Sequence, residues 1–191
     1  MMAEQVTKIA FFTIADFKEE EVWLRERARE GLHLVRMVVP CFYIFEKGVP
    51  EDVFYRLDYT NNEESGDYTR MLTDFGWENC GRCMGWVYWR RSAAEAENEG
   101  ESELFTDDAG RLDMVKKVVQ TRLLPLLLIF FACVLPNLFR ALDGDIYYGA
   151  GGFASGFFLG FFGVMTAVYL YLFIHCGGKL RRMQRELERK E

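Results

Sequence analysis

Hydrophobic and polar positions divide the chain into two regions. Charged and apolar residues are mixed up to about residue 122, whereas residues 123–174 contain almost no charge. A shift this sharp indicates that the two regions occupy different environments. We therefore expect an amino-terminal domain at residues 1–91, followed by long apolar helices.

Strand-like and helix-like patterns alternate in the first region. Four strand patterns cover residues 7–15, 33–47, 53–60 and 82–91, and apolar residues at helical spacing mark helices at 17–31 and 67–77. This order, β-α-β-β-α-β, predicts an α+β, ferredoxin-like domain in which an antiparallel sheet carries two helices on one face. Pro40, inside the second strand pattern, indicates an edge strand or a bulge.

The expected strands are apolar on both faces. A sheet with one solvated face should alternate apolar and polar residues, so the face away from the helices is expected to be covered. The cover is a second copy, the juxtamembrane helix, a partner protein or an apolar ligand; partly exposed aromatic residues are the alternative. The candidate ligand-binding or partner-binding residues are six aromatic side chains: Tyr43, Phe45, Tyr55, Tyr59, Trp86 and Trp89.

An acidic segment and a helix connect the domain to the apolar runs. Residues 92–103 are acidic and small, which is typical of a flexible linker. Residues 104–122 place apolar side chains on one helix face and predict a juxtamembrane helix. This helix either transmits changes in the domain to the membrane or serves only as a spacer, and the spacer is favoured.

Two apolar runs predict a transmembrane hairpin. Residues 123–139 are near the shortest length that spans a bilayer, and residues 148–175 are long enough to span it with some tilt. Residues 140–147 form the connecting loop. Pro136 is expected to kink or end the first helix. A buried hairpin of a soluble protein is disfavoured, because basic residues flank both runs.

The basic residues also predict an orientation. Lys116, Lys117 and Arg122 precede the first run, and a basic tail helix at residues 176–191 follows the second. The loop carries two aspartates, with a single arginine at its edge. Because cytoplasmic flanks are rich in Lys and Arg, we expect two spans in the cytoplasmic (inner) membrane, with both termini in the cytoplasm and the lipid bilayer as a partner.

Four glycines predict a packing face on the second span. Gly152, Gly156 and Gly160 are four residues apart, and Gly163 follows. Small residues at this spacing let another helix approach closely in a bilayer. The other helix is either the first span or the same helix of a second copy. Neither span contains a charged side chain, which argues against a stand-alone transporter or channel.

The composition disfavours several functional classes. The formal net charge is −6, so nucleic acid is not an expected partner. Cys80 and Cys83 form a CxxC pair, but an aromatic strand follows them instead of a helix, and no second ligand pair completes a metal site. His33 stands alone at the start of a strand. We therefore expect no metal, no cofactor and no enzymatic activity, and the alternative of an enzyme rests on the two cysteines.

Several motifs give the chain a family resemblance. These motifs are Phe45 to Tyr59 (FEKGVPEDVFYRLDY), Asp74 to Glu78 (DFGWE) and Trp89 to Arg91 (WRR), together with Trp23-Leu24, Gly31-Leu32, Tyr68 and Leu104 to Asp107. In this combination the chain resembles the domain of unknown function 2812 family over about residues 7–122. Leu32 departs from the pattern, because many members have Trp there. The resemblance implies a bacterial, membrane-anchored cytoplasmic domain, encoded near PadR-like transcriptional regulators, and it carries over no catalytic residues.

Two functions follow as hypotheses. In the first, the chain is a non-enzymatic, membrane-anchored binding or regulatory module, linked to a PadR-like regulator and acting on a ligand, a protein partner or a second copy. In the second, it is an accessory subunit of a membrane transport or envelope-stress complex. That complex would assemble through the glycine face of the second span.

Overall fold

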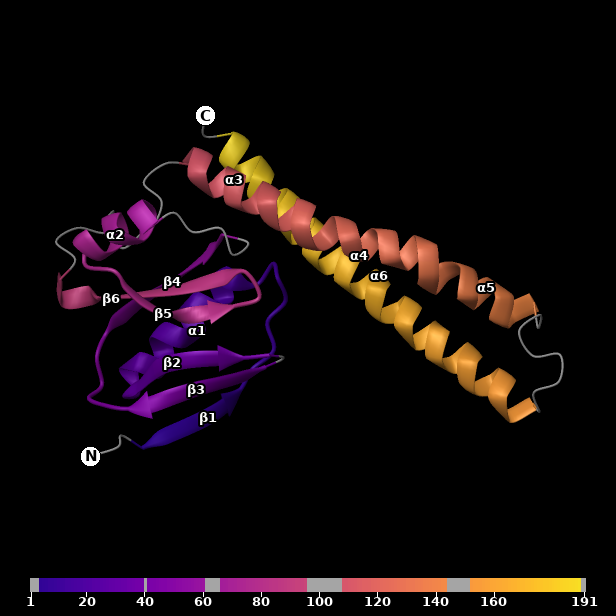
Figure 1. Ribbon diagram of the computed structural model, residues 1–191, viewed down its shortest axis with the longest axis horizontal. Helices are drawn as coiled ribbons and strands as arrows, with labels where there is room; N and C mark the ends of the chain where they lie inside the picture. The colour runs from indigo at the N-terminus through magenta and orange to yellow at the C-terminus, as the bar shows by residue number, and fades with distance from the viewer. Residues whose placement is uncertain (1–3, 40, 61–65, 96–107, 144–151, 190–191) are drawn as a thin grey trace. The chain divides into compact units, whose positions relative to one another are not determined.

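The computed structural model describes residues 4–39, 41–60, 66–95, 108–143 and 152–189 (Figure 1). The chain separates into two units, Met1–Lys117 with Glu186–Glu191, and Val118–Arg185. The first unit is α+β and the second is helical, as the change in composition predicted.

The first half of the α+β unit folds as a three-stranded antiparallel sheet with one helix. Strand β1 (Gln5–Ile9) leads to helix α1 (Phe17–Arg29), and β2 (Leu32–Val38) and β3 (Phe42–Lys47) follow. Strand β3 lies in the centre, so the strand order is β1-β3-β2. Helix α1 therefore connects β1 and β2, which run parallel to each other on either side of β3.

The second half repeats this arrangement. Strand β4 (Val53–Tyr59) leads to helix α2 (Gly66–Asp74), and β5 (Glu78–Cys83) and β6 (Trp86–Ser92) follow. The strand order is β4-β6-β5, which matches the first half strand for strand. A short 3-10 helix (Ala93–Glu95) ends the repeat. The domain is therefore two β-α-β-β repeats.

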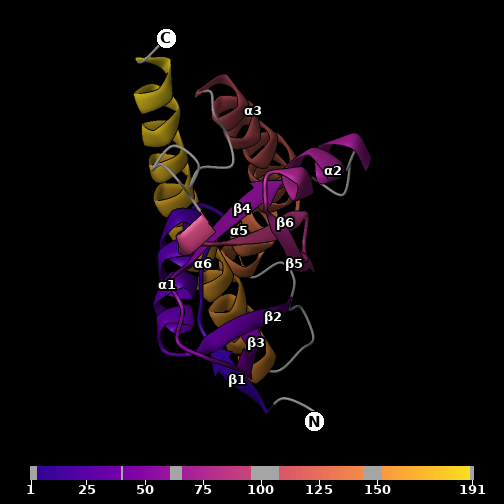
Figure 2. The ribbon, with the colours of Figure 1, turned by 90° about the vertical axis from the view of Figure 1, so that its left-hand side faces the viewer.

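The two repeats meet along strands β2 and β5, and we call this boundary the seam. Figures 1 and 2 both show the strands side by side in the order β4, β6, β5, β2, β3, β1. Gly81 lies beside Val35, and the Cys83 side chain forms a hydrogen bond with the backbone of Val39, so the two strands run in the same direction. No ladder of backbone hydrogen bonds joins them within the described strands.

Bulges at facing positions explain why the seam has no ladder. The pairing of β2 with β3 shifts register between Leu34 and Arg36, and that of β5 with β6 shifts between Asn79 and Gly81. A bulge twists its strand and interrupts edge pairing. The backbone N–H of Leu34 instead donates to the hydroxyl of Tyr55 at 3.2 Å, which joins the repeats through a side chain.

The two helices lie on opposite sides of the strands (Figure 2). Helix α1 crosses the seam: Trp23 contacts Tyr43 of the first repeat, and Phe17 stacks on Trp86 of the second. Helix α2 covers the other face of the second sheet, where Leu72 and Trp77 join Val87 and Trp89 in a buried cluster. The faces are opposite because side chains alternate along a strand.

The predicted α+β class is confirmed, but the β-α-β-β-α-β order is not what the structure shows. Two of the four strand patterns are hairpins: residues 33–47 divide into β2 and β3, and residues 82–91 contain the turn between β5 and β6. Met84 and Gly85 both have positive φ, 48° and 83°. Positive φ at both central residues is the geometry of a tight type I′ hairpin turn.

A glycine contact fixes the start of β2 against the end of β3. Gly31 has φ +80°, and a Cβ there would lie 2.7 Å from the carbonyl oxygen of Gly48. The backbone N–H of Gly48 in turn donates to the carbonyl of Gly31 at 2.9 Å. A Cβ on Gly48 would meet the ring of His33 at 2.8 Å. The positive φ and the backbone contact require glycine at position 31, whereas a side chain at position 48 would displace the ring of His33.

The first helix of the second unit passes through both prolines. Helix α3 (Asp108–Val118) continues through a π-helical turn (Val119–Leu123) into α4 (Leu124–Ile129), and a second π-helical turn (Phe130–Val134) precedes α5 (Leu135–Asp143). Proline lacks the N–H that would bond to the residue four positions earlier. A wider turn before Pro125 and Pro136 accommodates this loss. Pro136 therefore does not end the helix.

Helix α6 (Gly152–Glu188) is the second long helix, and it includes most of the predicted tail. Phe130 of the first helix stacks on Tyr169 at 5.5 Å and contacts Phe173 edge-on at 5.7 Å. Aromatic residues therefore hold this hairpin together. Helices Asp113–Asp143 and Gly156–Glu186 are long and apolar enough to cross a membrane.

Parts of the predicted boundaries lie outside the described residues. Residues 92–95 of the predicted linker belong to β6 and the 3-10 helix, and its remainder lies outside the described ranges. The same holds for residues 144–147 of the predicted loop and for residues 148–151 of the predicted second span. The limits of these segments stay predictions.

Candidate functional site

The six aromatic residues predicted as a binding face lie inside the domain. Tyr43, Phe45, Tyr55, Tyr59, Trp86 and Trp89 are all buried. Helix α1 covers Tyr43 and Phe45 through Trp23, while Trp89 lies in the cluster beneath α2. The chain's own helices therefore cover these six side chains. None of the six side chains is available as a surface in the folded domain.

The predicted glycine face is open in the described part of the helical unit. No described atom lies within 4 Å of the position that a Cβ on Gly156, Gly160 or Gly163 would take. The surroundings of Gly152 lie outside the described residues. The contact between the two helices is made by Phe130, so the first span does not occupy this face in the described residues.

A buried carboxylate joins the two repeats beneath α1. The hydroxyls of Tyr43 on β3 and Tyr88 on β6 both donate to one oxygen of Glu20, each at 2.7 Å. Burial raises the pKa of Glu20, and the two tyrosine hydrogen bonds partly oppose that rise. Burial also raises the pKa of both tyrosines, so they stay protonated donors. This cluster lies in the interior, and its hydrogen bonds link the two repeats.

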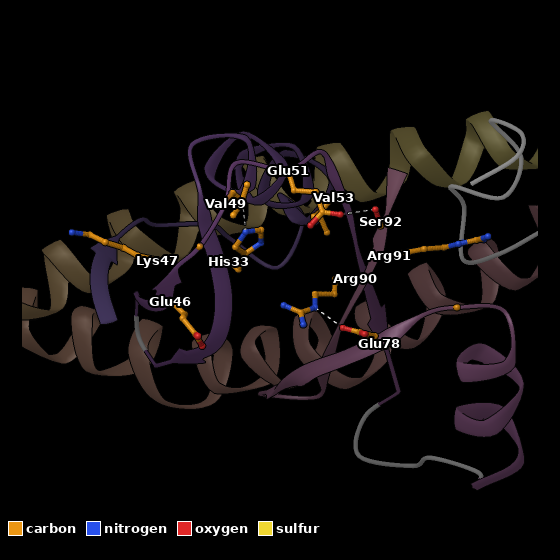
Figure 3. Close-up of a pocket in the computed structure, with 12 residues that line it drawn as sticks. His33, Glu46, Lys47, Val49, Glu51, Val53, Glu78, Arg90, Arg91 and Ser92 are labelled. Carbon is orange, nitrogen blue, oxygen red and sulfur yellow. Dashed lines mark hydrogen bonds and ion pairs between the residues drawn. The ribbon is translucent and has the colours of Figure 1, made fainter. Parts of the chain in front are cut away.

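A charged cleft opens at one end of the seam (Figure 3). Its volume is about 500 Å³, within the range of small-molecule sites. Its lining comes from five strands, β2 to β6, and from the β3–β4 and α2–β5 connections: His33, Glu46, Lys47, Gly48, Val49, Glu51, Val53, Gly76, Glu78, Arg90, Arg91 and Ser92. We call this space the seam cleft.

Side chains from both repeats face each other across the seam cleft. Figure 3 shows His33, Glu51 and Ser92 on one side and Arg90 and Glu78 on the other. The Nε of Arg90 donates to Glu78 at 2.8 Å, and the hydroxyl of Ser92 donates to Glu51 at 2.6 Å. The Nε2 of His33 lies 2.9 Å from the carbonyl oxygen of Val49 and donates to it. The polar groups are thus held in defined positions.

Arg90 is a half-buried cation of the seam cleft. Burial lowers its pKa, but the hydrogen bond to Glu78 and the nearby Cys80 outweigh burial, so the net shift is upward. Burial raises the pKa of Tyr55, its other neighbour, to about 12. The guanidinium therefore stays charged beside a neutral phenol. Such a group can bind an anionic part of a ligand through directed hydrogen bonds.

The CxxC pair lies on strand β5, and the pKa of both thiols is raised. Cys80 occupies the bulge of β5, and Cys83 ends that strand. Burial raises the pKa of the Cys80 thiol to about 12 and that of Cys83 above its usual value, whereas reactive thiols have lowered values. In the described segments no three His, Cys, Asp or Glu side chains converge as a metal-ligand set.

Three motifs that carry the family resemblance converge on the seam cleft. The motif around Lys47 and Gly48 supplies one wall, Gly76 and Glu78 supply the second, and the arginine pair after Trp89 supplies the third. The sequence resemblance included these segments, but the predicted contacts were aromatic residues in or beside the motifs, and the charged and glycine positions of the seam cleft were missed. His33 was predicted to stand alone, because no local sequence pattern indicates that β2 lies beside β5.

The fold and the seam cleft define a class: a two-repeat α+β domain with a small-molecule-sized cleft between its repeats, followed by two long apolar helices. The family described as "Protein of unknown function (DUF2812)" matches residues 16–129, and the chain belongs to that family. The match includes both repeats from α1 onward and the first part of the helical region. No curated protein and no solved structure matches the chain.

Proposed function

We propose that this protein is a non-enzymatic, membrane-anchored binding module that takes up a small ligand in the seam cleft. The observation that carries the proposal is the convergence of three family motifs on one polar cleft between two repeats. Ligand sites occur preferentially at such internal interfaces. Regulation of a partner, such as a PadR-like transcriptional regulator, is the role that the family resemblance favours.

Anchoring is supported by the two helices of the second unit. In the most apolar 18-residue stretch of each, 17% and 0% of the residues are buried. The core helix of a soluble protein would be mostly buried, so these apolar surfaces need lipid or another protein around them. The flanking basic residues favour an inner-membrane hairpin with both termini in the cytoplasm.

We expect the full chain to stay in the membrane fraction after alkaline carbonate extraction and to require detergent for release. Deletion of residues 118–185 should release the remaining chain into the soluble fraction. A reporter fused to either terminus should show a cytoplasmic location. Release of the full chain by carbonate would contradict anchoring, and a periplasmic signal at either end would contradict the orientation.

Ligand binding is tested with the full chain in lipid nanodiscs by hydrogen–deuterium exchange. Addition of a small-molecule extract from the source cells should slow amide exchange at residues 45–53, 76–78 and 89–92 together. Arg90→Gln should abolish this protection, whereas Arg36→Gln, which removes an exposed arginine on the outer face of the first sheet, should keep it. Protection that is absent, or unaffected by Arg90→Gln, would rule out the seam cleft.

A second candidate function is that of an accessory subunit, supported by the open space beside Gly156, Gly160 and Gly163 among the described residues. In a bilayer such a face accepts a close helix. Gly160→Leu should then disrupt co-purification of another integral membrane protein, whereas Phe158→Leu, an exposed position on a different face of the same helix, should not. Identical co-purification from both variants would remove this candidate.

A further inference from the structure

We propose that the ligand of the seam cleft is a small zwitterion that carries an ammonium and a carboxylate group, as in an amino acid or a short peptide. This inference rests on the proposed function and names the chemical class of its ligand. It starts from the charges of the lining, the near absence of apolar side chains and the positions of the charged groups.

The lining of the seam cleft is balanced in charge. Three cations, Lys47, Arg90 and Arg91, accompany three carboxylates, Glu46, Glu51 and Glu78. A ligand with a single excess charge would meet repulsion from one of these sets. A molecule with one charge of each sign meets both sets favourably, provided that the charges lie at opposite ends.

Two groups inside the seam cleft match such a ligand. The guanidinium of Arg90 points into the open space (Figure 3) and presents the planar donors that bind a carboxylate. Across the space, the carboxylate of Glu51 is held in place by Ser92 at 2.6 Å and provides an acceptor for an ammonium group. Lys47 pairs with Glu4 at 2.6 Å and extends outward, so it contributes to the rim.

The lining disfavours other classes of ligand. The apolar side chains in it are Val49 and Val53, and it contains no aromatic side chain. An apolar ligand or a nucleobase would therefore find no matching surface, and a quaternary ammonium would lack an aromatic cage. A phosphate ester would bring a double negative charge beside three glutamates.

The test measures binding to the full chain in nanodiscs by isothermal titration calorimetry. The probes are L-alanine, L-alanyl-L-alanine and its tripeptide homologue. Two blocked dipeptides are matched controls: the N-acetyl form lacks the ammonium, and the C-terminal amide lacks the carboxylate. We expect at least one probe to bind, and each blocked form to bind at least about tenfold more weakly, because it loses one of the two charge-assisted contacts.

Two variants locate the site. Arg90→Gln and Glu51→Gln should each weaken binding of the free probe about tenfold or more. Glu51→Gln should leave the affinity for the N-acetyl form unchanged, because that form has no ammonium group. Arg36→Gln and Glu26→Gln, which remove exposed charges elsewhere, should leave all affinities unchanged. A loss of affinity that is equal for free and blocked probes would overturn the assignment of roles.

The outcomes separate this inference from the proposed function. If the cell extract protects the seam cleft from exchange but no probe binds, or phosphoethanolamine binds better than the dipeptide, the ammonium–carboxylate class is wrong and the site stands. If neither the extract nor any probe affects the seam cleft, both the class and the proposed function fail.

Discussion

Replacing Glu20 with alanine is expected to lower the free energy of unfolding by about 2–5 kcal/mol. The change leaves the buried hydroxyls of Tyr43 and Tyr88 without their shared acceptor, and each unsatisfied buried group costs about 1–3 kcal/mol. All four tryptophans lie in the α+β unit, so tryptophan fluorescence during urea denaturation reports its unfolding. An unfolding free energy unchanged within 0.5 kcal/mol (roughly the scatter of surface substitutions) would show that the cluster does not join the repeats.

Glu20→Gln is the matched control, because the amide keeps an acceptor oxygen but cannot ionise. Burial raises the pKa of Glu20 above its usual 4.5, so the folded state holds the proton more tightly than the unfolded state. Glu20 therefore makes its full contribution to the free energy of unfolding below pH 4.5, and this contribution is lost as the pH rises through the pKa of Glu20 in the folded state. As the pH rises through this range, the Gln variant should become more stable relative to wild type. If it became less stable instead, the upward direction of the Glu20 pKa shift would be contradicted.

Trp89→Ala is expected to cost about 3–5 kcal/mol of stability, the usual range for removing a large buried aromatic side chain. Trp89 is 0% exposed and contacts Leu72, Trp77 and Val87 under α2. The loss leaves a cavity that the short helix α2 covers on one side only, and the unfolding transition should move to lower urea concentration.

Phe11→Ala is the control for this prediction, because Phe11 is 79% exposed. Its effect should stay within about 0.5 kcal/mol, as for most surface positions. If Trp89→Ala proved as mild as Phe11→Ala while abolishing recovery of a partner protein, Trp89 would be a contact residue and its burial would be misassigned.

The sequence pattern predicted the class of the domain and the positions of its apolar residues, but not its topology. The α+β class follows from periodicity, which is a local property. The two missed hairpins have turns without the usual Asn-Gly signal: Met84 takes a positive φ that its residue type rarely adopts, and β2 and β3 are separated by only three residues. A continuous apolar run across a tight turn is therefore hard to distinguish from one long strand.

The seam cleft was predicted only in part. The motifs around Gly48, Glu78 and Arg90 marked three of its walls, but nothing local indicates that they meet. Their meeting depends on β2 lying beside β5, which is a tertiary contact between strands about 45 residues apart in this two-repeat fold. The six aromatic residues were chosen because both faces of each strand are apolar. Helices α1 and α2 on opposite sides explain that pattern for the second sheet, whereas α1 alone covers the first sheet and leaves Phe42 on its other face exposed.

The long apolar helices were the part most readable from sequence, since length and lack of charge are sufficient. The path of the first helix around its prolines was not predicted. Pro136 was expected to kink or end the first helix, but a π-helical turn (Phe130–Val134) precedes it and the helix continues to Asp143. Whether a proline stops a helix depends on how the preceding turn adapts, and residue type alone does not reveal that adaptation.

The missing ladder at the seam has a mechanical consequence. Two sheets joined by backbone hydrogen bonds resist separation along their whole length, whereas β2 and β5 are held by side chains and by the strap of helix α1 across them. Among the described residues, the hydrogen bonds of Glu20 to Tyr43 and Tyr88 tie the two sheets together beneath α1. A ligand that bound in the seam cleft would therefore act on two sheets that can shift against each other more easily than the strands of one continuous sheet.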